Sequence, residues 1–78
     1  MRVTVKLYGT LRRLSNEGTP GLWVGEVPEG LDINGLIRPL GTRSEEVAAA
    51  AVNGTPKELS YRLTEGDLVV LVTPVGGG

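Results

Sequence analysis

The chain opens with a regular alternation of apolar and polar residues. Between residues 2 and 8 the apolar positions are Val3, Val5 and Leu7. This period of two predicts a strand with one buried face. Residues 10–14 predict a turn or a single helical turn. Residues 22–27 predict a second strand, ended by Pro28 and Gly30, and the two strands would pair as an antiparallel hairpin.

A helical period follows at Asp32. The apolar residues after it have the spacing of one helix face and are Ile33, Leu36, Ile37 and Leu40. Asp32 is a good N-cap, whose carboxylate can accept a free backbone N–H of the first turn. Pro39 lacks an N–H, and its ring collides with the carbonyl four residues back. We therefore expect little more than two turns, with the apolar stripe lying on the sheet.

Residues 44–53 support two interpretations. Ser44 can cap a helix, two acidic residues follow it, and four alanines favour helix, so local propensity alone predicts a helix here. The alternative is a central strand covered on both faces. Such a strand would turn at Asn53-Gly54, which is a strong hairpin signal.

The second half of the chain contains one continuous apolar run, residues 68–72. A run of this kind is typical of a central strand with both faces in contact. Residues 64–67 predict the turn before it, and residues 57–61 could form a short edge strand. The first and last strands are the most apolar, so they are expected to be parallel neighbours in the middle of a sheet crossed by the helix.

Composition excludes several classes of function. With 78 residues the chain allows one domain, and its net charge of −1 argues against a general nucleic-acid binder. It contains no Cys and no His, which excludes thiol catalysis, disulfides, Cys or His zinc sites and the Ser-His-Asp triad. The acidic residues are scattered. We therefore expect neither a self-sufficient enzyme nor a bound metal or cofactor.

The location follows from two further absences. The first residues alternate and lack the apolar core of a signal peptide. No apolar run approaches the roughly 20 residues that span a bilayer. A cytoplasmic protein without a membrane partner is the expectation.

The chain finishes with Gly76-Gly77-Gly78, shortly after the apolar run and Pro74. Chain ends fray and often contain glycine, so an inert tail is one interpretation. The other is a working tail. Glycine has no Cβ and can thread a narrow channel, while the proline limits the arc of the tail. Since no other group in the chain offers a useful nucleophile or electrophile, the carboxylate of Gly78 is the candidate reacting group.

A free carboxylate must be activated before it can donate its acyl group. The simplest activation is a mixed anhydride with AMP, which sulfide or a persulfide can attack to give a thiocarboxylate, and a thiol to give a thioester. The chain has no Walker-type phosphate loop. A partner protein must therefore bind and use the ATP.

The chain resembles the ubiquitin-like β-grasp sulfur carriers of the ThiS and MoaD type, and among them the small subunit of molybdopterin synthase. The residues that carry the resemblance are 3–14, 51–54, 63–71 and 74–78, in the order VNG…L-x-x-GD-x-V-x-x-x-x-PV-x-GG. The resemblance implies an α+β fold, a mixed sheet of four to five strands crossed by one short helix. It also implies a strand at 47–53, against the local propensity, and a division into a domain at 1–75 and a flexible tail at 76–78.

The same resemblance implies a function. Gly78 would be adenylated by a partner related to ubiquitin-activating enzymes and converted to a thiocarboxylate. The tail would then enter the large catalytic subunit of molybdopterin synthase and deliver sulfur for molybdenum cofactor biosynthesis. Gly77 and Gly78 match the terminal Gly-Gly of the family, and Gly76 lies where the family varies. The expected partner-binding residues are Gly76, Gly77, Val75, Pro74, Tyr8, Val70 and Val72, the last two on an apolar sheet face opposite the helix.

Other functions share this chemistry. The chain could carry sulfur for thiamine synthesis or for tRNA thiolation. A ubiquitin-like modifier joined to lysines through Gly78 would begin with the same adenylation. A plain binding module with an inert tail is a further alternative, and deletion of Gly78 would not affect it.

Overall fold

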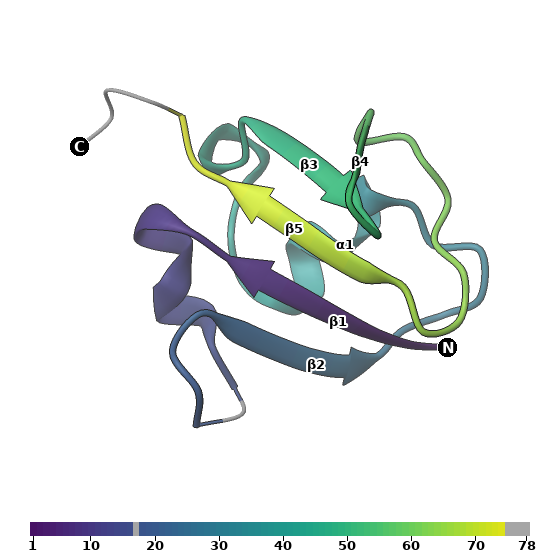
Figure 1. Cartoon of the computed structure of the whole chain (residues 1–78), viewed down its shortest axis with the longest axis horizontal. Coiled ribbons are helices and arrows are strands. Elements are labelled where there is room, and N and C mark those ends of the chain that lie inside the picture. The colour runs from purple at the N-terminus through teal and green to yellow at the C-terminus, as the bar shows by residue number, and fades with distance from the viewer. Residues whose placement is uncertain (17, 75–78) are drawn as a thin grey trace.

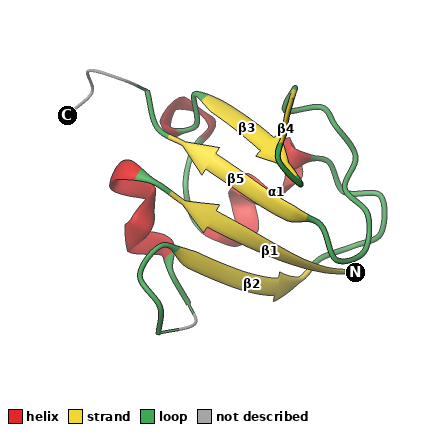
Figure 2. Cartoon of the chain, in the orientation of Figure 1, coloured by secondary structure: helices red, strands yellow, loops and turns green. Residues whose placement is uncertain are grey.

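The described residues, 1–16 and 18–74, form one five-stranded sheet that a single α-helix crosses on one face (Figures 1 and 2). In this computed structural model the order across the sheet is β2-β1-β5-β3-β4. The strands are β1 (Arg2–Leu7), β2 (Leu22–Glu26), β3 (Ala49–Val52), β4 (Thr55–Lys57) and β5 (Leu68–Val72). The helix α1 spans Ile33–Leu40, and two short 3-10 helices are η1 (Gly9–Leu14) and η2 (Ser44–Glu46). This is the predicted α+β fold of the β-grasp type.

The first and last strands are parallel neighbours at the centre of the sheet. Val5 of β1 lies opposite Val69 of β5. The pairs on either side of this central pair, β1 with β2 and β5 with β3, are antiparallel, which makes the sheet mixed. The prediction from the two most apolar segments is therefore confirmed.

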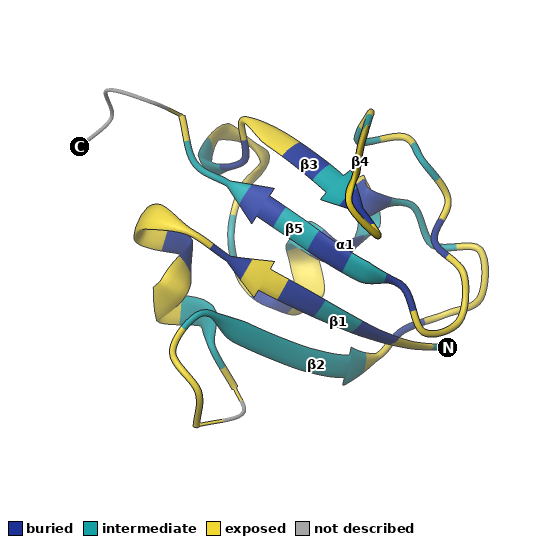
Figure 3. Ribbon diagram, in the orientation of Figure 1, coloured by how far each residue is buried: buried dark blue, intermediate teal, exposed yellow. Residues whose placement is uncertain are grey.

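The core lies between the sheet and α1 (Figure 3). Alternate residues of β1 and β5 face the helix, and the apolar stripe of α1 covers them. The largest fully buried side chains are Leu7, Leu11, Ile33, Leu36, Leu71, Val3, Val5 and Val69. Each contributes about 1.5–3 kcal/mol by leaving water. Truncation of one of them, such as Leu36→Ala, would cost about 2–5 kcal/mol of stability.

The helix begins and ends as its sequence predicts. The Asp32 carboxylate accepts the N–H of Gly35 at 2.8 Å, so it is the N-cap. The helix has eight residues, with Pro39 in its last turn, and Gly41 follows in the left-handed conformation. Gly35 weakens the helix intrinsically, but a Cβ at this position would overlap the Leu31 side chain. The packing of Leu31 against this position therefore favours a glycine.

The helix that local propensity favours at 44–53 is wrong. Only η2 is helical there, and Ala49–Val52 form β3 between β5 and β4. The pairing of Ala50 with Leu71 and of Val52 with Val69 places this segment inside the sheet, which overrides alanine's helical preference. The strand expected at 57–61 lies earlier, at Thr55–Lys57, because the Asn53-Gly54 turn returns the chain directly into β4.

Candidate functional site

The candidate site is the point where the chain leaves β5 toward its C-terminal glycines. The structure describes the chain here as far as Pro74, which is exposed. Four predicted site residues, Val75, Gly76, Gly77 and Gly78, lie outside the described residues. The site can therefore be built from the residues that hold the base of the tail and from the sheet face beside it.

The last residues of β5 are bonded on both sides. The backbone N–H of Tyr8 donates to the carbonyl of Leu71 at 3.2 Å, and that of Ala48 donates to the carbonyl of Val72 at 2.8 Å. Tyr8 belongs to the segment after β1, and Ala48 to the segment before β3. The strand that leads to the tail is thus held up to its last residue.

Gly9 makes room for the base of the tail. Its φ of +63° lies in the left-handed region, which favours glycine. A Cβ on Gly9 would overlap Oγ1 of Thr73, which is half-buried there. In the sequence, Gly9 is distinguished only by its place between the predicted strand and the predicted turn. The missing signal is the contact with Thr73, which depends on β1 and β5 being neighbours.

The sheet face opposite α1 has an apolar half. Val70 and Val72 of β5 lie on it, as predicted, and are half-buried (Figure 3). They border a shallow hollow of about 210 Å³, whose lining is completed by Ala49, Ala50, Ala51 and Pro56. We refer to the exposed side of β5, β3 and β4 as the open face. The role of Val70 and Val72 as partner contacts stays a prediction.

Tyr8 directly follows β1, beside the open face. Half of its surface is exposed, at 50%. It lines a second hollow of about 410 Å³ together with Lys6, Leu7, Arg12, Thr19, Pro20, Gly21 and Leu22. Lys6 lies opposite Val70 in the parallel pair, so the two hollows adjoin. Their linings differ in charge, since the first is uncharged and the second carries Lys6 and Arg12.

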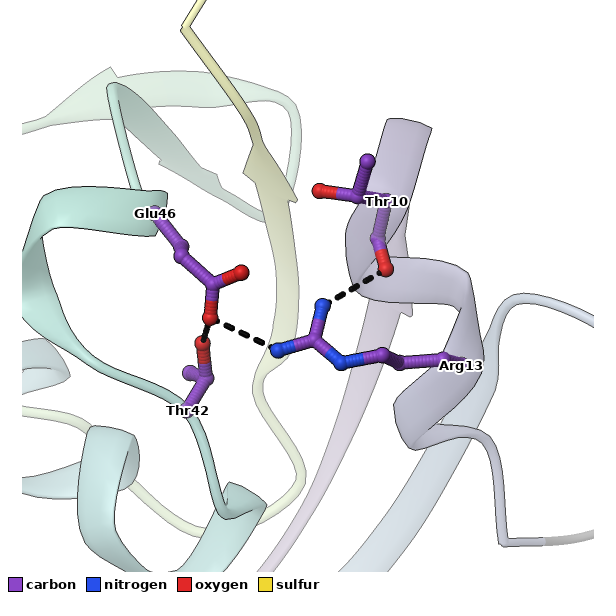
Figure 4. Close-up of polar contacts among 4 residues, drawn as sticks. All are labelled: Thr10, Arg13, Thr42 and Glu46. Atoms are coloured by element: carbon purple, nitrogen blue, oxygen red, sulfur yellow. Dashed lines mark hydrogen bonds and ion pairs between the residues drawn. The ribbon is translucent and has the colours of Figure 1, made fainter. Parts of the chain in front are cut away.

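An ion pair joins η1 to η2 across the end of β5 (Figure 4). Arg13 donates from Nη2 to Oε1 of Glu46 at 2.7 Å and from Nη1 to the carbonyl of Thr10 at 2.9 Å. The hydroxyl of Thr42 donates to the same carboxylate oxygen. The bond from Arg13, followed by that from Thr42, lowers the pKa of Glu46 to about 2. Glu46 is therefore charged at neutral pH.

The two motifs around Asn53 and Asp67 meet in one polar cluster, in which Asp67 is buried and Asn53 is exposed. Asp67 is only 4% exposed, and its carboxylate accepts from the Asn53 side chain at 2.9 Å and from the Thr64 N–H at 2.8 Å. The Asn53 side-chain oxygen accepts the N–H of Leu68 at 3.0 Å. Burial alone raises the pKa of Asp67, but the bonds from Thr64 and Asn53 outweigh it and lower this pKa. These motif residues hold the fold together, a role that sequence reasoning missed.

No group of three or more acidic residues gathers as a metal site within residues 1–16 and 18–74. None of the helices in this part of the chain is long and apolar enough to cross a membrane.

Both the sequence and the fold of this chain are similar to those of known proteins. The sequence profile of the ThiS family matches residues 5–78. SAMP1 from Haloferax volcanii has a similar structure, with a TM-score of 0.72, 17% identity and 100% of each chain covered. A comparison with curated proteins finds no significant match.

Two further solved structures are similar. The putative molybdopterin converting factor subunit 1 from Pyrococcus furiosus has a TM-score of 0.68 and 26% identity, over 95% of this chain and 98% of the other. The third structure is a complex of subunits 1 and 2 of molybdopterin-converting factor from Helicobacter pylori. Its matching chain has a TM-score of 0.62 and 24% identity, over 100% of both chains.

Proposed function

Because this chain belongs to the ThiS family of small sulfur carriers, we propose that its Gly78 carboxylate is adenylated by a partner enzyme and converted to a thiocarboxylate. The carboxylate oxygen attacks the α-phosphorus of ATP and pyrophosphate leaves. Sulfide (HS⁻) then attacks the acyl carbon, a C–S bond forms, AMP leaves with the electrons of the C–O bond, and loss of the S–H proton leaves the thiocarboxylate. Both steps take place in partners, so this chain acts as a co-substrate and binds no ATP itself.

The observation that carries the proposal is the anchoring of β5. Leu71 and Val72 are bonded from both sides, by Tyr8 and Ala48, and the glycines begin four residues after Val72. A carboxylate that must enter another protein's active site benefits from a fixed starting point, because misplacement of reacting atoms by about 1 Å can cost a hundredfold in rate.

We place the delivery of sulfur in molybdenum cofactor biosynthesis, with this chain as small subunit of molybdopterin synthase. The similarity to subunit 1 of molybdopterin converting factor from Pyrococcus furiosus supports this choice. The large subunit would cover the open face, where Val70 and Val72 border an apolar hollow beside the base of the tail. Tyr8, Pro74 and Val75 would lie at the edge of that contact. The work of such a carrier is cytoplasmic.

Two alternatives keep the same activation. The chain could supply sulfur to thiamine synthesis or tRNA thiolation, since the ThiS profile covers it almost entirely. It could also be attached to lysines as a ubiquitin-like modifier. These outcomes separate only after adenylation, when the acyl group passes to sulfur or to an amine.

The test is the intact mass of the chain after incubation with its adenylating partner, ATP and a sulfur donor. One carboxylate oxygen should be replaced by sulfur, and a thiol-reactive alkylator should trap the product on a C-terminal fragment. Oxidation of Met1 adds nearly the same mass, so the fragment assignment is essential. A chain lacking Gly77 and Gly78 is the matched control, because removal of Gly78 alone would leave Gly76-Gly77 as a new terminal Gly-Gly. Lysine conjugates without thiocarboxylate would favour the modifier, and absence of any activation would overturn the proposal.

A further inference from the structure

Two segments far apart in the sequence enclose the end of β5, and one ion pair joins them. We infer that the Arg13–Glu46 pair closes a collar around the end of β5 and fixes the direction in which the tail leaves the domain. The collar consists of residues 8–13, 42–48 and 71–73. Arg13 and Glu46 are therefore positioning residues, which act through the backbone of the strand and not on the reacting atoms.

The first support is that both segments of the collar hold the strand directly. The segment after β1 contributes the N–H of Tyr8 to Leu71, and the segment before β3 contributes the N–H of Ala48 to Val72. Figure 1 places η1 and η2 on the two sides of this end of β5. A link between η1 and η2 therefore keeps both hydrogen bonds in place together.

The second support is the way in which each end of the ion pair is anchored. Arg13 is fixed to its own segment by its bond to the Thr10 carbonyl, and Glu46 to its own segment by the Thr42 hydroxyl (Figure 4). The pair itself spans 33 positions of sequence. An ordinary surface pair lacks such anchors and loses most of its attraction to side-chain entropy. Here each side chain is already held by a hydrogen bond within its own segment, so less side-chain entropy is lost when the pair forms.

The third support is the fit of the tail base inside the collar. Oγ1 of Thr73 lies so close to Gly9, the first residue of η1, that a Cβ on Gly9 would overlap it. The tail base therefore contacts the very segment that carries Arg13. A shift of η1 would move Thr73 with it.

The contribution of the Arg13–Glu46 pair to the global stability of the domain is expected to be small. The side chains of Arg13 and Glu46 are 49% and 27% exposed, and ion pairs so open to solvent contribute little to stability. Orientation of the tail is a different matter, because a small rotation at Thr73 is amplified over the residues that follow. This part of the inference rests on the proposed function, in which Gly78 must reach a partner's active site.

The decisive experiment is a double-mutant cycle with Arg13→Gln, Glu46→Gln and the double variant. Amide hydrogen exchange of Tyr8 and Ala48, measured by NMR, reports the two bonds that hold β5. Each single variant should accelerate these two amides about two- to fivefold relative to the core amide of Val5. The double variant should be no faster than either single one, because both changes remove the same link.

The control is Arg43→Gln, which removes a positive charge beside η2 without touching the pair. It should leave the exchange of both amides unchanged. Three results would overturn the inference: additive effects of the two changes, equal acceleration of the Val5 amide, or an unchanged exchange rate at Tyr8 and Ala48.

A second readout connects the collar to activation. With the cell's own adenylating enzyme, ATP–pyrophosphate exchange is measured against the concentration of each variant. Poor orientation of the tail should lower kcat while KM for the variant chain stays within about twofold of wild type. A rise in KM alone would contradict the positioning role. If the wild-type chain is never activated, the proposed function fails, whereas the hydrogen-exchange cycle still decides the collar.

Discussion

The side-chain amide of Asn53 donates to Oδ1 of Asp67 at 2.9 Å, although 14 positions separate the two residues. The bond joins the turn after β3 to the turn before β5. Asn53 has a φ of +50°, which asparagine tolerates better than most residues, and its side-chain oxygen accepts the N–H of Leu68. Asn53 thus takes part in the turn between β3 and β4, and its side chain also holds the first residue of β5, the strand that leads to the tail.

Asp67→Asn should destabilise the protein. An amide cannot accept all three bonds that the carboxylate receives from Asn53 and Thr64, and its NH₂ group would face a donor. A buried donor left unsatisfied costs about 1–3 kcal/mol. Urea denaturation at pH 7 should therefore give a free energy of unfolding lower by this amount, while the exposed substitution Glu58→Gln has little effect.

The same carboxylate predicts a pH dependence. Its pKa in the folded chain is below the ordinary value of 3.8, so its contribution to stability is complete above that value. The contribution is lost as the pH falls through the folded pKa. The difference in stability between wild type and Asp67→Asn should narrow below about pH 4. A difference that stays constant down to pH 2 would show that the carboxylate charge is irrelevant.

Much of this fold follows from local pattern, and the exceptions have a physical reason. The alternation in β1, the apolar run in β5 and the cap at Asp32 act within their own segments, so one sequence reveals them. The strand β3 does not, because its alanines favour a helix until β5 and β4 pair with them. The Arg13–Glu46 pair depends on the order of strands and has no local signal.

The candidate site, like the fold, could be predicted from the sequence only where the signal is local. The sequence placed Val70 and Val72 on the face opposite the helix, because alternation along β5 is a local property. It could not show that Gly9 receives Thr73, since that contact requires the parallel pairing of β1 with β5. The proposal that Gly78 is the reacting end rests on the resemblance and on chemistry alone.

Gly9→Ala should reduce thermal stability for two separable reasons. The positive φ alone costs about 1–2 kcal/mol in a residue with a Cβ, and the overlap with Thr73 adds to it. In a domain of this size each kcal/mol lowers Tm by about 4–8 °C. The double variant Gly9→Ala/Thr73→Ala should regain the stability lost to the overlap, because Oγ1 is gone. It should keep the loss caused by the positive φ of residue 9.

The matched control for that pair is Gly66→Ala. Gly66 also has a positive φ, of +80°, but no heavy atom lies within 4 Å of a Cβ placed there. Its substitution isolates the backbone strain, and Thr73→Ala should not improve it. Equal rescue of both glycine variants by Thr73→Ala would refute the contact between Gly9 and Thr73.

The Glu46 carboxylate should titrate with a midpoint near pH 2, measured from its ¹³C chemical shift. Arg13→Gln should raise this midpoint toward the ordinary 4.5, because Arg13 is the largest cause of the shift, and Thr42→Val should raise it less. Since the folded pKa is lowered, any stabilisation by the pair is complete above pH 4.5 and disappears as the pH falls through about 2. A midpoint near 4.5 in wild type would mean that the pair does not form in solution.

Val70→Glu tests whether the open face docks the large subunit. Val70 is half-buried, and Lys6 lies directly opposite it on β1, so the new carboxylate gains a cationic neighbour and the domain should remain folded. A charge in the middle of an apolar contact must lose its water when the partner binds. Loss of a central contact commonly costs about 2 kcal/mol or more, which corresponds to about a thirtyfold weaker Kd by calorimetry.

Asn34→Glu provides the control, because it adds the same charge to an exposed position of α1, on the other side of the sheet. This variant should bind the large subunit as wild type does. If Val70→Glu retains the wild-type Kd while its Tm is unchanged, the partner does not use the open face. If Asn34→Glu weakens binding equally, net charge and not the apolar contact controls the complex.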